Sequence, residues 1–257
     1  MSDLLDPERL LASGAIARLE YFETLDSTQD VASRLAREHA GPTPLLVAAE
    51  QQTAGRGRGA NRWWTGHGSL AFSLLLDPAD WLLPRVPLPE RSLAVGVAIV
   101  ETLQPLLPGR RVGLHWPNDV FVDDKKISGV LVDVLTDGQH VIGIGLNVNN
   151  SLVGAPDEVR ARATSLHDQT GDAVDRTALL IELLLNLKSC LQESVAAPEE
   201  FGRRFGELCL QLGHELTLES GGQVTTGICG GVAVDGALIL ETRDGFQKFY
   251  SGVLRKE

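Results

Sequence analysis

Short apolar runs that alternate with amphipathic stretches are the feature that most constrains the fold of this chain. The runs at 45–50 and 69–76 consist mainly of Leu, Val, Ala and Phe and lie on either side of a glycine-rich segment. Their length and their flanking turn residues indicate buried strands rather than helices. A third run of this kind covers 140–149. Because helical patterns lie between such runs and no internal repeat occurs, the sequence predicts an α+β fold.

The first half of the chain predicts a strand, a helix and a second strand in succession. Residues 16–24 have the character of a strand, and a helix is expected over 28–40, ending before Gly41-Pro42. Ser27 and Asp30 have the spacing of a capping box, so we expect their side chains to satisfy the first amides of this helix.

The middle of the chain predicts one long helix followed by consecutive strands. The helix is expected from about Pro89 to Leu107, and the strands over 112–118, 119–135 and 140–149. Asp137-Gly138 is a strong hairpin signal between the last two strands.

The character of the sequence changes near Leu210. Residues 156–210 are mostly helical in pattern, whereas 211–257 contain short alternating runs separated by three glycine-containing turn signals. We therefore expect a main domain over 1–210 and a small β-barrel of about five strands over 211–257. A module this small is only marginally stable alone, so we expect it to pack against the main domain.

Charge and composition exclude several classes of protein. The 23 basic and 34 acidic residues give a net charge of −11, which argues against a general binder of nucleic acid or of anionic membranes. The three cysteines have no metal-ligand spacing and are expected to be idle thiols. No apolar run approaches the roughly 18 residues of a membrane span, and no secretory signal is visible. A cytoplasmic protein is expected.

The segment 50–69 is cationic in an otherwise acidic chain. Between Glu50 and Asp77 there is no acidic residue, while Arg56, Arg58 and Arg62 are interleaved with glycines. Glycines allow backbone amides to approach an anion, and guanidinium groups bind phosphate or carboxylate oxygens in pairs. A solvated arginine–glycine hairpin explains the spacing about equally well.

Two nucleotide-binding motifs are excluded for this loop, although a base could stack beside it. The sequence GRGRG lacks the lysine of a P-loop, and Ala60 stands where a dinucleotide fingerprint requires glycine. Trp63 and Trp64 follow, and either ring could stack on a nucleobase. A tryptophan in the core or at its rim is the commoner role.

Lysines are scarce, and two of the five are adjacent. Lys125 and Lys126 precede a strand, so alternation directs them to opposite faces and only one can enter a pocket. An ammonium group there could neutralise the charge that develops in an acyl-phosphate transition state. A solvated pair at the end of a hairpin is the alternative, and it is the commoner one for an unplaced pair of lysines.

The run 141–150 leaves room for a ligand. Gly143 and Gly145 are small enough to let a molecule lie against the sheet, and Asn147 could hydrogen-bond a purine edge or serve structurally. The histidines show no metal-binding spacing and no nucleophile elbow occurs, so neither a metal site nor serine chemistry is expected.

Taken in order, these motifs resemble those of a known family. DSTQD at 26–30, QQTAGRGRG at 51–59, WPND at 116–119, KKISG at 125–129 and GIGLNVN at 143–149 are similar to the catalytic domain of biotin–protein ligases. The resemblance extends over about 16–257. It implies a mixed β-sheet domain like that of class II aminoacyl-tRNA synthetases, followed by an SH3-like barrel. Agreement of separate motifs in one order is far more specific than any single match.

The resemblance implies a two-step acyl transfer. Biotin and ATP, with Mg²⁺, form biotinyl-5′-AMP, and the biotinyl group then passes to a lysine of a biotin carboxyl carrier protein. Lys126, Arg56 and Arg58 match the family's catalytic positions. The positions that match its biotin-binding residues are Ser27, Thr28, Gln29, Gln52, Gly55, Arg56, Gly57, Arg58, Lys126, Gly129, Gly143 and Gly145. Those that match its ATP-binding residues are Arg58, Arg62, Trp63, Asn118, Asp119 and Asn147.

The chain departs from the family pattern at two places. Gln29 stands where the family usually has Asn, and Gly59-Ala60-Asn61 is less basic than the commoner GRGRRGR loop. We expect the less basic loop to retain the adenylate more weakly. About 20 residues precede the first catalytic strand, too few for the family's helix-turn-helix domain, so no DNA binding is expected. Monomers and homodimers both occur in the family.

Two other functions fit parts of the pattern. One is a lipoate or octanoate ligase or transferase of similar fold. The other is a non-catalytic RNA-binding protein that uses the arginine–glycine loop and the C-terminal strands, although the net acidity of the chain disfavours it.

Overall fold

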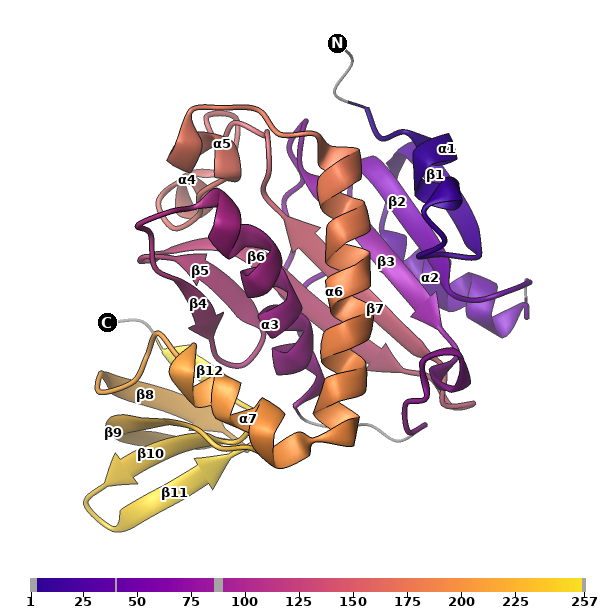
Figure 1. Ribbon diagram of the computed structural model, residues 1–257. Coiled ribbons are helices and arrows are strands. Elements are labelled where there is room, and N and C mark those ends of the chain that lie inside the picture. The colour runs from indigo at the N-terminus through magenta and orange to yellow at the C-terminus, as the bar shows by residue number, and fades with distance from the viewer. Residues whose placement is uncertain (1–3, 40, 86–89, 256–257) are drawn as a thin grey trace.

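A computed structural model describes residues 4–39, 41–85 and 90–255. Its centre is a mixed sheet of seven strands in the order β1-β2-β3-β7-β6-β5-β4 (Figure 1). The strands are β1 (Arg18–Leu25), β2 (Leu45–Gln52), β3 (Leu70–Leu76), β4 (Val112–His115), β5 (Asp119–Val122), β6 (Lys125–Val134) and β7 (His140–Leu146). β1 and β2 run parallel, and every other pair is antiparallel. The predicted α+β class is confirmed.

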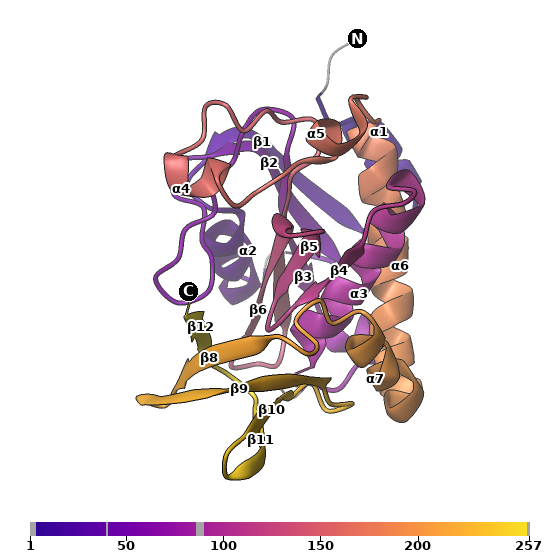
Figure 2. The ribbon, with the colours of Figure 1, turned by 90° about the vertical axis from the view of Figure 1, so that its left-hand side faces the viewer.

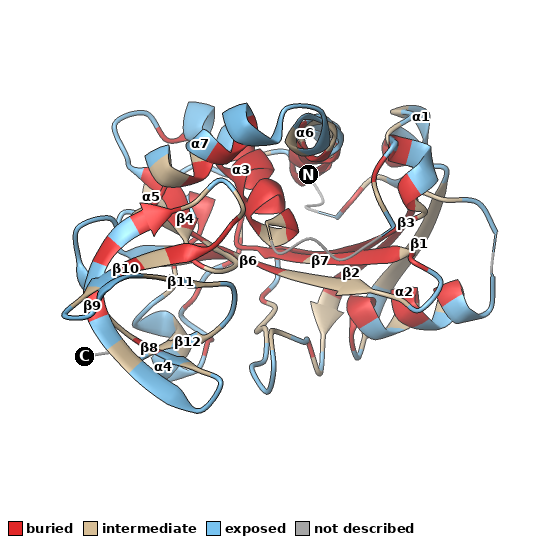
Figure 3. Cartoon of the chain, turned by 90° about the horizontal axis from the view of Figure 1, so that it is seen from below, coloured by how far each residue is buried: buried red, intermediate tan, exposed pale blue. Residues whose placement is uncertain are grey.

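The two faces of this sheet are covered differently (Figure 3). On one face lie α3 (Arg91–Leu103) and α6 (Arg176–Ala196), which form the main core with the apolar side chains of that face. On the other face α2 (Thr28–Arg37) packs on Val47, Leu75 and Val141 through Ala32 and Ala36. The rest of that face, towards β6, is left to a loop rather than to a helix.

The remaining helices are short or peripheral. They are α1 (Pro7–Ala12), α4 (Asp157–Arg160), α5 (Leu166–Thr170), α7 (Pro198–Glu207) and the 3₁₀ turns η1 (Pro78–Trp81) and η2 (Gln104–Leu106). The helix predicted over Pro89–Leu107 thus corresponds to α3 and η2, and its expected start, Pro89, lies outside the described residues. The helical pattern of 156–210 divides among α4, α5, α6 and α7.

The predicted capping box of α2 is wrong, although its position is right. Ser27 is the N-cap residue, but its side chain makes no capping hydrogen bond. The amide of Thr28 instead donates to Oε1 of Gln52, 2.8 Å away, and the carboxylate of Asp30 turns outward to Arg56. A residue 24 positions along the chain therefore satisfies the first amide of the helix, which leaves the Ser27 hydroxyl for another role.

The strand predicted over 119–135 is wrong in one respect, because it is two strands. The chain reverses at Asp123-Asp124, where Asp123 adopts a left-handed conformation with φ of 54°. Aspartate tolerates this conformation better than most residues, and the double-aspartate turn was the signal that the sequence interpretation passed over. The predicted hairpin at Asp137-Gly138 is confirmed, with Gly138 at φ of 84°.

The C-terminal residues form a second, five-stranded antiparallel sheet, which lies beneath the central sheet in Figure 2. It consists of β8 (Glu215–Ser220), β9 (Gln223–Val232), β10 (Leu238–Thr242), β11 (Gly245–Phe249) and β12 (Val253–Arg255). The turns at Gly221-Gly222, Asp235-Gly236 and Asp244-Gly245 fall where the sequence predicts them. The indole of Trp116 donates to the carbonyl of Gly236, which ties this sheet to the central one.

Two expectations from composition can be compared with the structure. None of the helices within the described residues combines the length and the apolar character that a membrane span requires. All three cysteines are buried free thiols, as the sequence predicts.

Candidate active site

A row of small residues crosses the sheet on the face that α2 leaves open. In register, Gly129 on β6 pairs with Gly145 on β7, and Gly145 pairs with Ala71 on β3. The next row contains Gly143 beside Ser73. With hydrogen, methyl or hydroxymethyl side chains at these positions, a flat molecule can lie directly against the backbone of the sheet.

The indole of Trp63 lies on this floor. A Cβ atom at Gly145 would overlap the ring, and one at Gly129 would lie 3.3 Å from it. Only glycine permits so close an approach at Gly145. The Nε1 atom of Trp63 is buried and has no hydrogen-bond partner in the described part of the chain. A buried donor of this kind costs free energy unless a ligand or water accepts its proton.

The loop that carries Trp63 closes on itself. The amide of Trp63 donates to the carbonyl of Gly55, and the amide of Gly57 donates to that of Asn61, both at 2.9 Å. The cationic loop is therefore a tight hairpin whose glycines permit its turns. A Cβ atom at Gly55 would meet the Trp63 carbonyl oxygen at 2.6 Å, which explains glycine there.

Lys126 lies on the same face as the glycine row. Strict alternation along β6 would place Lys126 on the other face of the sheet from Gly129. The pairing of β5 and β6 shifts register after Val120, and this β-bulge brings the Lys126 side chain to the face of Gly129. Its Nζ is 2.7 Å from Oδ1 of Asp119 and lies 5.6 Å from the centre of the Trp63 ring. Lys125 is exposed. Of the two lysines, Lys126 alone faces the glycine row.

The opposite wall of the floor is polar. Ser27 and Thr28 are buried, and Gln52 contacts Thr28 at both its amide and its hydroxyl. The Nε2 of Gln52 donates to Thr65 at 3.2 Å. The Ser27 hydroxyl has no partner among the described residues. Ser27 and Trp63, both predicted site residues, thus each carry a buried polar atom without a hydrogen-bond partner among the described residues.

The three loop arginines point in different directions. Arg56 pairs with Asp30 at 2.8 Å. Arg58 donates to the carbonyl oxygen of Gly252, between β11 and β12, so it ties the loop to the C-terminal sheet. Arg62 is exposed, and its backbone forms a bridge with that of Arg56.

The two asparagines predicted to bind a base are held by the protein. Asn118 donates from Nδ2 to the carbonyl of Val130 at 2.6 Å. Asn147 is buried, donates to the carbonyl of Thr164 at 3.0 Å and accepts from Asn150 at 3.1 Å. These hydrogen bonds orient each side chain. The second Nδ2 proton of each asparagine is the one that could be donated to a nucleobase.

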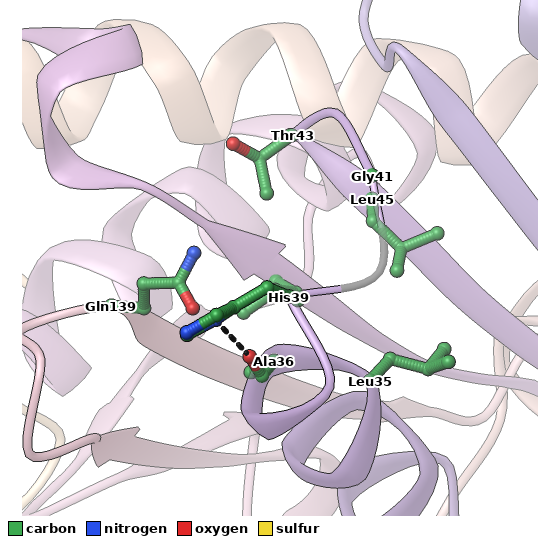
Figure 4. Close-up of a pocket in the computed structure, with 8 residues that line it drawn as sticks. Leu35, Ala36, His39, Gly41, Thr43, Leu45 and Gln139 are labelled. Atoms are coloured by element: carbon green, nitrogen blue, oxygen red, sulfur yellow. Dashed lines mark hydrogen bonds between the residues drawn. The ribbon is translucent and has the colours of Figure 1, made fainter.

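A cavity of about 480 Å³ opens beside the loop. It brings Arg56 and Arg58 together with Asn118 and the end of β6, whereas Lys126 and the glycine row lie outside its lining. Its volume is typical of a small-molecule site. A second hollow, of about 120 Å³, lies where α2 ends, between His39, Thr43 and Gln139 (Figure 4). That hollow is too small for a nucleotide.

One functional pair was missed from the sequence. Arg176 at the start of α6 lies 2.8 Å from Glu50 Oε2, and the two side chains are 2% and 4% exposed. Arg176 also donates to the carbonyl of Ser69. Because Glu50 and Ser69 lie at the two ends of the cationic segment, this buried pair fixes the base of the loop. Glutamate inside the apolar run 45–50 was the available signal, since an unpaired buried charge is rare.

The chain that carries this site is similar to known protein sequences. Residues 21–149 match the profile of the biotin/lipoate A/B protein ligase family. The chain is 32% identical over 239 residues to the bifunctional ligase/repressor BirA of Bacillus subtilis, covering 91% of this chain and 72% of that protein. It is 33% identical over 216 residues to the biotin–[acetyl-CoA-carboxylase] ligase of Mycobacterium tuberculosis, covering 82% of this chain and 79% of that one.

Solved structures agree with these sequences. The biotin protein ligase of Aquifex aeolicus in complex with biotin and ATP superposes with a TM-score of 0.80 at 31% identity, covering 94% of this chain and 100% of that one. The same enzyme without ligand gives a TM-score of 0.76 at 29% identity, with 93% and 99% covered.

Proposed function

This chain belongs to the biotin/lipoate A/B protein ligase family, and we propose that it is a biotin–protein ligase. It uses ATP to convert biotin to biotinyl-5′-AMP and then transfers the biotinyl group to a lysine of a biotin carboxyl carrier protein. The observation that carries this proposal is the glycine-floored slot with the Lys126 ammonium group at its edge. The fused ring of biotin fits on such a floor when the Trp63 indole, which lies there in this structure, moves off it, and the carboxylate of biotin requires a cation beside it.

The first step joins two anions, so its main requirement is electrostatic. An oxygen of the biotin carboxylate attacks the α-phosphorus of ATP, the bond to the bridging oxygen breaks, and pyrophosphate leaves. We assign Lys126 to the developing charge, and Arg56 and Arg58 to the biotin carboxylate and the phosphates, because preorganised cations stabilise such a transition state strongly. Ser27, whose buried hydroxyl has no partner within the described residues, is assigned to the ureido head of biotin.

The second step needs little from the protein except positioning. The amine of the acceptor lysine attacks the acyl carbon of the mixed anhydride, an amide forms, and AMP leaves with the bonding electrons. Water competes for the same carbon, so the loop must exclude it. The hairpin of residues 55–63, tied to the C-terminal sheet through Arg58, supports such a covering role.

We propose that Mg²⁺ binds together with ATP. Mg²⁺ prefers phosphate oxygens and water, and it is usually completed by one or two carboxylates. Asp119, which lies beside Lys126, is a predicted site residue of suitable chemistry. We propose that the enzyme works in the cytoplasm, in keeping with its free thiols. Sedimentation distinguishes a monomer from a homodimer, both of which occur in the family.

Gly145→Ala is expected to weaken the binding of biotin by about tenfold, because a core that is overpacked by one methyl group loses about 1–3 kcal/mol. The added Cβ atom would stand on the floor where the ring of biotin is proposed to lie, at a point where it also overlaps the Trp63 indole. Calorimetric titration with biotin measures the effect. Gly154→Ala is the control, since nothing lies within 4 Å of a Cβ atom there. Equal affinities of the two variants would contradict the assignment of the floor.

Asn61→Arg is expected to slow the release of biotinyl-5′-AMP, by about threefold to tenfold, which is the size of one added charge-assisted contact. Asn61 is exposed, and only its backbone takes part in the hairpin, so the substitution adds a cation without breaking the loop. The dissociation rate of labelled adenylate is the measurement, with Asn61→Gln as the uncharged control. Identical rates for all three proteins would sink the idea.

The proposed activity is tested by incorporation of labelled biotin into a purified biotin carboxyl carrier domain in the presence of ATP. Label should appear on the wild-type domain and not on one whose acceptor lysine is replaced by arginine. Parallel reactions with lipoate and a lipoyl domain address the other branch of the family. Labelling by lipoate alone would replace biotin with lipoate as the substrate.

A further inference from the structure

Asp133 joins two of the site's elements through a single carboxylate. It lies on β6, where its Oδ2 accepts a hydrogen bond from Nε2 of Gln29 on α2 at 3.0 Å. The same oxygen is 3.8 Å from a guanidinium nitrogen of Arg56 in the loop. Asp133 is not among the residues that match the family's site positions, and it takes no part in the proposed catalytic steps.

Gln29 fixes the orientation of this carboxylate. It is buried, and its Nε2 also donates to the carbonyl of Val141 at 3.1 Å, so both amide protons are used. Its Oε1 accepts from the hydroxyl of Ser73 at 3.0 Å, and that hydroxyl lies 2.9 Å from the hydroxyl of Thr28. A continuous chain of polar contacts therefore runs from the polar wall of the slot to Asp133.

Gly143 provides the space for this arrangement. A Cβ atom at that position would overlap Oε1 of Gln29. The glutamine side chain thus crosses the sheet directly over a glycine to reach Asp133. The family that the motifs resemble usually has asparagine at the position of Gln29, and the asparagine side chain is one methylene shorter. We expect it to fall short of Asp133.

Arg56 is held from two sides. One guanidinium nitrogen donates to Asp30 Oδ1 on α2 at 2.8 Å, and the other faces Asp133 on β6. Since a guanidinium group is planar, two partners on different elements define its plane as well as its position. Without them a half-exposed arginine would sample many rotamers, and ordering it upon ligand binding would cost free energy.

We propose that Asp133 is a positioning residue for Arg56 and that it pre-orders the guanidinium group for the anionic end of the ligand. The inference rests on the proposed function, which supplies that ligand. Asp133 is 35% exposed and the separation is 3.8 Å, so its attraction for Arg56 is weak compared with that of a directly bound carboxylate or phosphate. Its effect is therefore to orient Arg56 rather than to compete with the ligand.

The test compares biotin with biotin amide, which lacks the negative charge, by calorimetric titration. Asp133→Asn retains an acceptor for Gln29 and removes only the charge. We expect the affinity for biotin to fall about twofold to tenfold, the cost of immobilising one flexible side chain. The affinity for biotin amide should stay unchanged. Asp133→Glu should restore part of the loss, and in an Arg56→Gln background Asp133→Asn should have no effect.

Glu38→Gln is the matched control, because Glu38 forms an exposed ion pair with Arg34 at the C-terminal end of α2, the end opposite to Thr28. It should leave both affinities unchanged. Equal losses for biotin and biotin amide in Asp133→Asn would show a purely structural role and overturn the proposal. Tighter binding of biotin would overturn it as well, since Asp133 would then compete with the ligand. A wild-type protein that binds neither compound would instead overturn the proposed function, and this inference with it.

Discussion

Replacement of Lys126 by alanine is expected to lower the rate of biotinyl-5′-AMP formation by about 10²–10³-fold, the usual effect of removing one preorganised group that stabilises a transition state. The β-bulge of β6 directs this ammonium group over the glycine row, beside Asp119 and the Trp63 ring. Without it, the carboxylate and the α-phosphate approach one another with their repulsion uncompensated. Single-turnover formation of the labelled adenylate measures the rate.

Lys125→Ala is the matched control for this prediction. The two lysines are adjacent, but Lys125 is exposed at the end of the β5–β6 hairpin. Its removal should change the rate by less than about twofold, as is usual for a solvated charge. If the two variants lose activity equally, the assignment between the lysines is wrong.

Arg176→Met is expected to destabilise the protein by about 3–5 kcal/mol, because it leaves Glu50 as an unpaired buried charge. The Glu50 carboxylate also accepts hydrogen bonds from the Tyr21 hydroxyl at 2.5 Å and from the Leu5 amide at 3.2 Å. Burial, together with this hydrogen bond, raises the pKa of Tyr21, so the phenol stays a neutral donor to Glu50. A neutral donor does not replace the lost cation. Urea denaturation measures the free energy of unfolding.

Two further variants show whether pairing is the cause. Glu50→Gln combined with Arg176→Met should recover part of the loss, since the unpaired charge is then gone. Arg9→Met removes a partner from the exposed pair with Asp175 and should cost less than about 1 kcal/mol. A similar small cost for Arg176→Met would contradict the view that this pair anchors the loop.

Local patterns in the sequence predicted the elements well. Alternation and turn chemistry act over a few residues, so the hairpin at Gly138 and the three glycine turns of the C-terminal sheet were predictable. Burial of the runs that became β2 and β3 followed from their composition alone. The resemblance of separate motifs then predicted the family.

The features that the sequence did not predict correctly depend on contacts between residues far apart in the chain. Ser27 lost its capping role because Gln52 supplies the acceptor, and Arg176 reaches Glu50 across 126 positions. Neither contact has a local signature. The side of the sheet that Lys126 faces depended on a β-bulge, which strict alternation does not include.

The central claim, activation of biotin by ATP in the glycine-floored slot, is tested most directly by exchange of labelled pyrophosphate into ATP. With purified, folded protein, MgATP and no acceptor, exchange should require biotin, saturate with its concentration and nearly vanish in Lys126→Ala. Absence of exchange at saturating biotin, or exchange that depends on lipoate instead, would contradict the account.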